Sequence, residues 1–284
     1  MDTDLNYSAL IEEIRTAIEN DQLILPSAPD TVIRARKLLD DPTATTEQLA
    51  SLIATDTALA ARILKVANSV IYKTHNGIDN LQEAISRLGQ KLIQTLITSH
   101  AMMQLFAQNN ATVNDPVTRL LKEVQTRSIE IARLSYAIAR HNRQLSADDA
   151  LLAGLVHDIG YLPLLQVLGK AKMLNRDDQN VSLFLKTCHP GVGGNILRKW
   201  NFPHTFIDVA EQHENLVRKG SGEVDLVDII IVANLLLEEK NNPQTDISTF
   251  KASVSAFVRL GLNLETSLAD FDEHIEIASQ LLPH

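Results

Sequence analysis

The chain has 284 residues, of which 45% are hydrophobic and 21% are charged, so it can bury a core and lacks the composition of a disordered protein. Only 4% of the residues are aromatic, and the dominance of aliphatic side chains favours helices packed on helices. The net charge of −9 argues against non-specific nucleic-acid binding, because such binding needs Lys and Arg to neutralise phosphates. The length allows one large domain or two ordinary ones.

The cysteine content and the N-terminal sequence both bear on where the protein is located. A single cysteine fits a reducing compartment. Cys188 is the single cysteine, so no internal disulfide can form. Residues 1–20 are acidic and lack the basic and apolar segments of a secretory signal. No run of about 18 apolar residues is present, so no membrane-spanning helix is expected. We therefore expect a soluble cytoplasmic protein without membrane contact.

The first third of the sequence predicts a bundle of short helices, and no strand pattern competes. Residues 8–20 are expected to form an amphipathic helix, and residues 92–106 a buried one. The signals for helix starts between them are Asp30, Thr45-x-x-Gln48, Asp56 and Asn80-x-x-Glu83. The expected breaks are Pro26–Pro29, Asp40-Asp41-Pro42, residues 72–77 and Gly89. We expect residues 1–109 to form an N-terminal helical lobe.

Residues 110–284 predict a second group of helices. Residues 109–116 are polar and end in a proline, so they are the best linker candidate. Helices are expected at about 117–141, 183–200, 204–218 and 226–237, with more after the polar residues 241–246. Ser146-x-x-Asp149 is expected to cap a helix that begins shortly before residue 151.

This capped stretch, residues 151–160, predicts an apolar helix that ends in a His-Asp pair. Its apolar residues recur at i, i+1, i+4, i+5 and i+8, which places them on one buried helical face. Gly160 is expected to supply the helix stop. A neutral imidazole at His157 beside a carboxylate at Asp158 offers either two ligands for a divalent metal or a base with an orienting partner.

Several motifs along the chain carry a resemblance to a known family. They are Leu25-Pro26-x-x-Pro29, Ile53-Ala-x-Asp56-x-x-Leu59, Leu64-x-x-Ala67-Asn68-Ser69, Gly154-Leu-Val-His157-Asp158-Ile-Gly160 and His189-x-x-Val192-Gly193-Gly194-x-Ile196-Leu197-x-x-Trp200-x-Phe-Pro203. Over about residues 20–240, the sequence resembles HDOD domains, all-helical relatives of the HD metal-dependent phosphohydrolases that are commonly bacterial signalling modules. The resemblance implies an all-α, multi-helical HD-domain-like bundle with an N-terminal helical lobe.

The HD superfamily site consists of an early His, an adjacent His-Asp pair and a late Asp. The resemblance places the pair at His157 and Asp158, but it places Arg127 where the early His belongs and Asn234 where the late Asp belongs. A guanidinium is a permanent cation without an acceptor, so Arg127 would repel a metal and could pair with Asp158 instead. Both Arg127 and Asn234 are therefore expected to be degenerate ligand positions.

The dinuclear relatives use additional histidines, and two have counterparts here. These are His189 and His213, whereas Gln212 stands where a further histidine would be. The tentative metal set is therefore His157, Asp158, His189 and His213. The alternative is structural: the Asp158 carboxylate bonds Arg127 or Asn234 and joins two helices, and the other two histidines are satisfied polar core residues.

Two further groups of residues have open interpretations. The polar residues at one helix end are either a capped loop or a partner surface: Lys65, Asn68, Ser69, Tyr72 and Lys73. The glycines Gly191, Gly193 and Gly194 follow no strand, so they are expected to allow close helix packing and not to form a phosphate loop.

Three functions remain open from the sequence. The first is a non-catalytic signalling module that binds a protein partner or a small ligand such as a nucleotide through its two lobes. The second is a metal-dependent phosphohydrolase acting on a phosphoester or cyclic nucleotide, and the third is a metal or ligand sensor without turnover. No cofactor is required by the first, while one divalent ion (Zn, Fe, Ni or Mn) fits the tentative set. The sequence leaves the oligomeric state open.

Overall fold

The computed structural model describes residues 25–72, 77–108, 115–174, 179–219, 222–242, 254–263 and 265–282, together with residues 12, 16, 17 and 20. Its described regular structure consists of helices, and no strand occurs in these parts of the chain. The expected all-α fold is therefore confirmed. The expected helix at residues 8–20 lies almost wholly outside the described residues.

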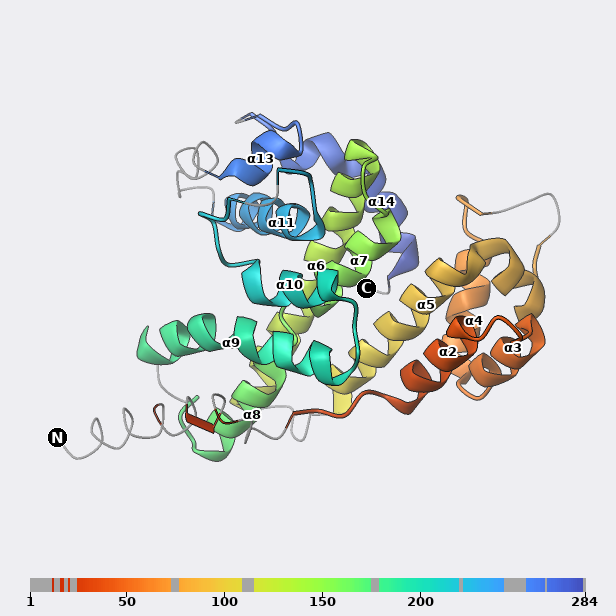
Figure 1. Ribbon diagram of the computed structural model, residues 1–284, viewed down its shortest axis with the longest axis horizontal. Helices are drawn as coiled ribbons and strands as arrows, with labels where there is room; N and C mark the ends of the chain where they lie inside the picture. The colour runs from red at the N-terminus through yellow and green to blue at the C-terminus, as the bar shows by residue number, and fades with distance from the viewer. Residues whose placement is uncertain are drawn as a thin grey trace.

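The N-terminal lobe contains α2 (Asp30–Asp40), α3 (Thr46–Ala54), α4 (Thr57–Ala67) and the first part of α5 (Leu81–Gln108). Figure 1 shows α2, α3 and α4 gathered at one end of the molecule, with α5 running from them into the remaining helices. The break that the sequence predicts at Gly89 is present, because this residue has a φ of +80° inside α5. That conformation is readily accessible only to glycine.

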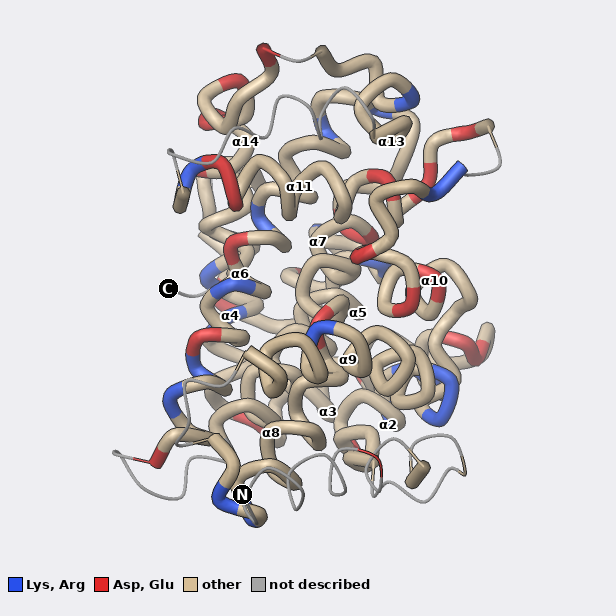
Figure 2. Tube along the Cα trace, turned by 90° about the vertical axis from the view of Figure 1, so that its left-hand side faces the viewer, with Lys and Arg blue, Asp and Glu red and all other residues tan. Residues whose placement is uncertain are grey.

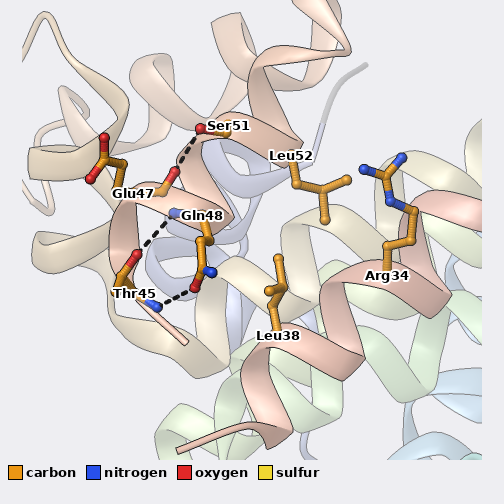
Figure 3. Close-up of a pocket in the computed structure, with 7 residues that line it drawn as sticks. All are labelled: Arg34, Leu38, Thr45, Glu47, Gln48, Ser51 and Leu52. Carbon is orange, nitrogen blue, oxygen red and sulfur yellow. Dashed lines mark hydrogen bonds between the residues drawn. The ribbon is translucent and has the colours of Figure 1, made fainter. Parts of the chain in front are cut away.

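Side-chain caps begin several of these helices where the sequence predicts them. Thr45 accepts a hydrogen bond from the backbone N–H of Gln48, whose side chain accepts one from the backbone of Thr45 (Figure 3). Asp56 accepts hydrogen bonds from the first turn of α4. The expectation for Asp30 is wrong, since α2 has Pro29 as its N-cap and no side-chain cap bond.

The remaining helices follow residue 115 and include a fully buried stretch. They are α6 (Pro116–Asn142), α7 (Ala147–Val156), α8 (Tyr161–Lys170), α9 (Gln179–Lys199), α10 (His204–Gln212), α11 (Leu226–Asn241), α13 (Ser255–Arg259), the 3-10 helix η1 (Leu268–Phe271) and α14 (Asp272–Leu281). Every residue from Ala150 to Val156 is buried, and Ser146 caps α7 as predicted. A Cβ at Gly154 would lie 2.4 Å from the Cα of Ala132, so the α6 and α7 backbones are in close contact.

Most helix positions in this part of the chain agree with the sequence, but one boundary does not. The helix expected at 204–218 ends at Gln212, and His213 serves as its C-cap residue. Helices at 117–141, 183–200 and 226–237 are confirmed with slightly different ends. Buried side chains of both lobes form one continuous hydrophobic cluster. The division into domains at residue 109 stays a prediction.

Charged residues of both signs are interspersed along the helices, as Figure 2 shows. Within the described residues, one stretch is long and apolar enough to cross a membrane, namely Ala147–Lys170, which contains α7 and α8. However, 83% of its most apolar window is buried inside the protein, as is typical of core helices. This stretch is therefore only weak evidence for a membrane span.

A buried ionic cluster anchors α11 against the chain before and after it. The carboxylate of Asp228 is fully buried and accepts hydrogen bonds from Arg218, at 2.9 Å, and from Nε of Arg259, at 2.8 Å. Arg218 also bonds Asp225, the N-cap of α11. Burial opposes the charge on Arg218, but these carboxylates outweigh it and raise the arginine's pKa. The cluster thus holds α13 and α11 together.

Candidate metal centre

The turn between α7 and α8 carries the His-Asp pair into the protein interior. His157 directly follows α7, and its backbone N–H donates to the carbonyl of Ala153. Its Nδ1 lies 2.7 Å from the carbonyl oxygen of Gly154, so the ring is held by its own helix end. His157 is 0% exposed and Asp158 is 5% exposed. The Nε2 edge of the ring therefore faces the interior of the site.

Two further imidazoles are positioned in the same way by other helices. His189 lies within α9, and its Nδ1 is 2.9 Å from the carbonyl oxygen of Leu185. His213 ends α10, and its Nδ1 is 3.0 Å from the carbonyl oxygen of Val209. Both rings are buried. Because each Nδ1 faces a carbonyl acceptor, each Nδ1 carries the proton and each Nε2 is left with a lone pair.

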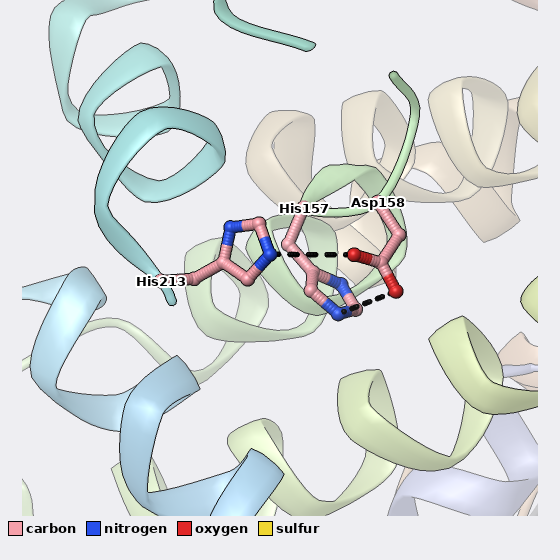
Figure 4. A group of neighbouring side chains, drawn as sticks. All are labelled: His157, Asp158 and His213. Carbon is pink, nitrogen blue, oxygen red and sulfur yellow. Dashed lines mark ion pairs between the residues drawn. The ribbon is translucent and has the colours of Figure 1, made fainter. Parts of the chain in front are cut away.

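These side chains converge on the carboxylate of Asp158, and Figure 4 shows two of them, His157 and His213, beside it. Its Oδ1 lies 3.2 Å from Nε2 of His189 and 3.3 Å from Nε2 of His213. Its Oδ2 lies 3.1 Å from Nε2 of His157. The structure thus brings together all four residues of the tentative metal set, although their role as ligands stays a prediction.

The cluster has too few protons for its acceptors. Nε2 of His189 and Nε2 of His213 are 3.0 Å apart, and two lone pairs at that distance repel one another. Nε2 of His157 is close to Asp158, but the contact does not have hydrogen-bond geometry, so this buried nitrogen has no hydrogen-bond partner among the described residues. A shared cation, either an extra proton or a metal ion, would resolve both conflicts.

Burial and mutual contact also perturb the acidities of these groups. Burial would raise the pKa of Asp158, but the charge interaction with His157 and the contacts with the other two imidazoles hold it well below its usual value. The carboxylate is therefore ionised. Burial lowers the pKa of His157, against the pull of Asp158. Burial opposes the charged form of His213 as well, but there Asp158 prevails and the pKa is raised.

Arg127 and Asn234 lie beside the cluster and contact each other. Nη2 of Arg127 donates to Oδ1 of Asn234 over 2.9 Å, and Nε of Arg127 is 4.0 Å from Oδ2 of Asp158. Both residues line a cavity of about 320 Å³ that reaches Asp158. The guanidinium thus stands where the cavity meets the carboxylate.

The same cavity contains residues that the sequence analysis did not single out. Tyr161 stacks on the ring of His189, with centroids 4.2 Å apart, and its burial raises the pKa of its hydroxyl. Lys186 and Glu214 form an ion pair of 3.5 Å at the cavity wall. Glu214 could also join His189 and His213 as a ligand. The position of Tyr161 directly after the His-Asp turn is a signal that could have indicated it.

The structure explains some of the glycines near the site differently from the sequence analysis. Gly160 has a φ of −63° and precedes α8, so it is not a left-handed helix stop. A Cβ there would lie 2.0 Å from the carbonyl oxygen of His189 and 2.7 Å from the nitrogen of Gly193. Close packing explains Gly194, where a Cβ would lie 2.5 Å from the side chain of Glu211. A Cβ at Gly193 would make only ordinary contacts from 3.4 Å outward, and a Cβ at Gly191 would meet nothing within 4 Å. The packing expectation for Gly191 is therefore wrong.

The candidate partner surface is partly used by the fold itself. Asn68 donates to the carbonyls of Leu64 and Ile78 and accepts from the N–H of Ile78, so its amide joins α4 to the next segment. Tyr72 is half-buried, and burial raises its pKa to about 12. Lys65 is exposed. Lys73 lies outside the described residues, and partner binding at this surface stays a prediction.

Comparison with known proteins gives the family. The HDOD domain model matches residues 25–216. The chain belongs to the HDOD domain family. This HDOD chain is also 22% identical over 245 residues to an uncharacterized protein of Treponema pallidum (strain Nichols). That match covers 83% of the chain but only 46% of the relative, so the HDOD chain spans about half the length of the curated relative.

Solved structures share the fold over nearly the whole HDOD chain. A Shewanella amazonensis SB2B protein, provisionally identified as a metal-dependent phosphohydrolase, is 26% identical with a TM-score of 0.80, covering 98% of this chain and 99% of its own. An HDOD domain protein of unknown function from Geobacter sulfurreducens is 20% identical with a TM-score of 0.66, covering 97% and 98%. A provisionally identified signal transduction protein from Marinobacter aquaeolei VT8 is 21% identical with a TM-score of 0.61, covering 97% and 65%.

Proposed function

We propose that this chain is a signalling HDOD module without phosphohydrolase turnover, in which the histidine cluster holds one divalent transition-metal ion as a structural centre. The module acts by binding a protein partner or a small ligand through its two lobes. Membership of the HDOD family supports the signalling role, because HDOD domains are commonly signalling modules. The proposal that turnover is absent rests on the contacts of Arg127.

Metal-dependent hydrolysis needs an open position where a metal-activated water can meet the substrate. Here the approach to Asp158 from the cavity is occupied by the guanidinium of Arg127, which is tied to Asn234. A permanent positive charge 4.0 Å from Oδ2 of Asp158 disfavours a second cation there. This arrangement supports a closed site and not a catalytic one.

The donor atoms around Oδ1 of Asp158 are spaced for a single ion. Ligand atoms around a tetrahedral zinc are about 3.3 Å apart, given zinc–nitrogen distances near 2 Å. Oδ1 of Asp158, Nε2 of His189 and Nε2 of His213 are 3.0 to 3.3 Å from one another, and Nε2 of His157 lies 3.1 Å from the other oxygen of the carboxylate. Three neutral imidazoles that face an ionised carboxylate are also the donor set that zinc, iron, nickel and manganese accept. A metal held there would neutralise the buried carboxylate and join the helix ends that carry these residues.

The test combines metal content with hydrolysis of bis-p-nitrophenyl phosphate, using protein purified without chelator. We expect about one transition-metal ion per chain, loss of that ion in His157→Ala, and no hydrolysis in either protein. His204→Ala is a matched control, because His204 is exposed at the start of α10 and should keep the ion. Hydrolysis that disappears in His157→Ala would contradict the proposed lack of turnover. Absence of metal from the parent chain would contradict the proposed structural metal ion.

A metal-dependent phosphohydrolase is the second candidate, supported by the Shewanella relative and by the cations at the cavity. Arg127 and Lys186 both line the cavity beside Asp158, where they could bind a substrate phosphate. Under this alternative, Arg127→Ala would raise KM for the phosphodiester. The third candidate, a metal or ligand sensor, predicts a shift of the melting temperature when zinc or a cyclic nucleotide is added.

A further inference from the structure

A larger cavity lies at the junction of the two lobes, away from the histidine cluster. Its volume is about 1050 Å³, at the upper end of the range for small-molecule sites. It is lined mainly by α4, α5 and the second half of α14, with Gln125 of α6, and it shares no described lining residue with the cavity beside Asp158. Figure 1 shows the end of α14 next to the α4 and α5 side of the molecule.

The surface that lines this lobe-junction cavity is mostly apolar, although polar residues such as His100 and Gln104 also line it. Apolar side chains come from α4, α5 and α14, for example Ala61, Val66, Met103 and Leu281. Val70 stands at the rim with 84% of its surface exposed. No Phe, Tyr or Trp is among the described lining residues, so the cavity offers none of these rings for stacking a nucleobase. It is suited instead to an alkyl chain.

One strong cation projects into this apolar setting. Nη2 of Arg62 donates to Oγ of Ser99 and to the carbonyl oxygen of Leu281, at 3.0 and 2.8 Å. Its Nη1 has only the sulfur of Met103 at 3.9 Å, and its buried Nε has no hydrogen-bond partner among the described residues. No described carboxylate lies within ion-pair distance of Arg62. Burial lowers its pKa to about 10, which still leaves it charged at neutral pH.

The hydrogen bond of Arg62 to the end of α14 satisfies only part of the guanidinium group. The carbonyl of Leu281 gives Arg62 a partner at the negative end of a helix dipole. A partial charge does not replace a full counter-ion, and among the described residues Nη1 of the guanidinium has no oxygen partner. Lys65 follows at i+3 on α4 and also lines the cavity. Against these two cations, Glu276 is the one acidic residue in the described lining.

We propose that the lobe-junction cavity binds an amphipathic carboxylate, with its alkyl chain against the aliphatic walls and its carboxylate on Arg62. Lys65 supplies a second positive charge nearer the rim. A carboxylate head gives Nη1 of Arg62 the oxygen acceptor that the described residues do not supply, and charge-assisted bonds of this kind are the strong ones. A dinucleotide or cyclic dinucleotide is less suited to the cavity, because the described lining contains no Phe, Tyr or Trp ring for its bases. The proposal does not depend on whether the histidine cluster holds metal.

The test titrates the full chain with dodecanoate and with dodecan-1-ol, which have the same chain length and differ in charge, using calorimetry below their aggregation limits. We expect saturable binding of one dodecanoate per chain. Dodecan-1-ol should bind at least tenfold more weakly, the factor that one charge-assisted hydrogen bond supplies. Equal affinity for the two compounds, or no saturable binding of dodecanoate, would overturn the proposal.

Two variants separate the head-group contact from the cavity itself. Arg62→Gln should remove the preference for dodecanoate over dodecan-1-ol, whereas Arg34→Gln, an exposed arginine paired with Asp30 on α2, should leave it unchanged. Because Arg62 also bonds Ser99 and Leu281, its variant could lose stability. Ala61→Trp avoids this difficulty, since Ala61 is exposed on the cavity wall and a tryptophan there fills the space. Unchanged dodecanoate affinity in folded Ala61→Trp would refute the assignment.

Discussion

Replacing Gly160 by alanine tests whether helix packing assembles the histidine cluster. The added Cβ would lie 2.0 Å from the carbonyl oxygen of His189 and 2.7 Å from the nitrogen of Gly193. Both atoms belong to the backbone of α9, so no side-chain rotation relieves the contact. The turn after α7 and helix α9 must therefore separate by more than about 1 Å to restore ordinary van der Waals distances.

This separation acts directly on the site, because His189 is one of the residues displaced. Overpacking in a rigid core costs roughly 1–3 kcal/mol. We expect Gly160→Ala to lower the free energy of unfolding by about 3 kcal/mol. Backbone atoms must move, and the contact of His189 with Asp158 at 3.2 Å is lost. The assay is urea unfolding followed by far-UV circular dichroism, together with the metal content of each protein.

Gly191→Ala is the matched control on the same helix. Its Cβ would meet nothing within 4 Å, and Gly191 has helical structure. Alanine should therefore stabilise the protein by about 0.5–1 kcal/mol, the usual gain when a helical glycine is replaced without strain. If Gly160→Ala unfolds like the parent chain, or if both variants lose stability equally, the packing explanation of the site is refuted.

Two further substitutions test the structural interpretation. Asp228→Ala should lower the free energy of unfolding by about 3–5 kcal/mol in urea titrations, because it leaves Arg218 and Arg259 without the buried carboxylate between them; a loss below about 1 kcal/mol would contradict this. Asp56→Ala should cost about 1 kcal/mol at neutral pH as a lost helix cap. The backbone N–H of Leu59 is the main cause of the lowered pKa of Asp56, so its contribution is present above about pH 4 and lost below. The difference between parent and Asp56→Ala should therefore shrink as the pH falls, and a constant difference would exclude the carboxylate as its source.

Local signals in the sequence predict much of this fold. Thr45, Asp56 and Ser146 cap helices where the pattern places them, because capping depends on residues within one turn. Boundaries decided by distant contacts were less predictable. The helix that starts at His204 ends at Gln212, six residues earlier than the periodicity indicated. Tertiary contacts override local preference at such positions.

The composition of the site was more predictable than its chemistry. The resemblance grouped His157, His189 and His213, and the structure places them around one carboxylate. The position of Arg127 depends on how α6 packs against its neighbours, so the sequence could not show that its guanidinium would face both Asp158 and Asn234. Likewise, Asn68 has the composition of a surface residue, but its hydrogen bonds to a segment ten residues later were not visible from the sequence.

The pH dependence of stability can distinguish the two cations that the histidine cluster could share. If the cation is a proton, its natural site is His213, whose pKa is raised by Asp158 despite the opposing effect of burial. A raised pKa gives stability that is fully present below the unfolded value of about 6.5 and is lost as the pH rises through the folded value. His157 contributes with the opposite sign, since burial lowers its pKa. Comparing the parent with His213→Gln in chelator isolates the contribution of His213.

In chelator, the stability advantage of the parent over His213→Gln should therefore decrease as the pH rises above about 6.5. With bound zinc the dependence should reverse, because the imidazoles must be deprotonated to coordinate and metal affinity increases with pH. Urea unfolding of both proteins, with zinc and with chelator at each pH, measures the two slopes. Opposite slopes mean that proton and metal compete for one position between His189, His213 and Asp158. Parallel slopes would show that zinc does not bind at this cluster, and would leave the carboxylate neutralised by protons and by Arg127 alone.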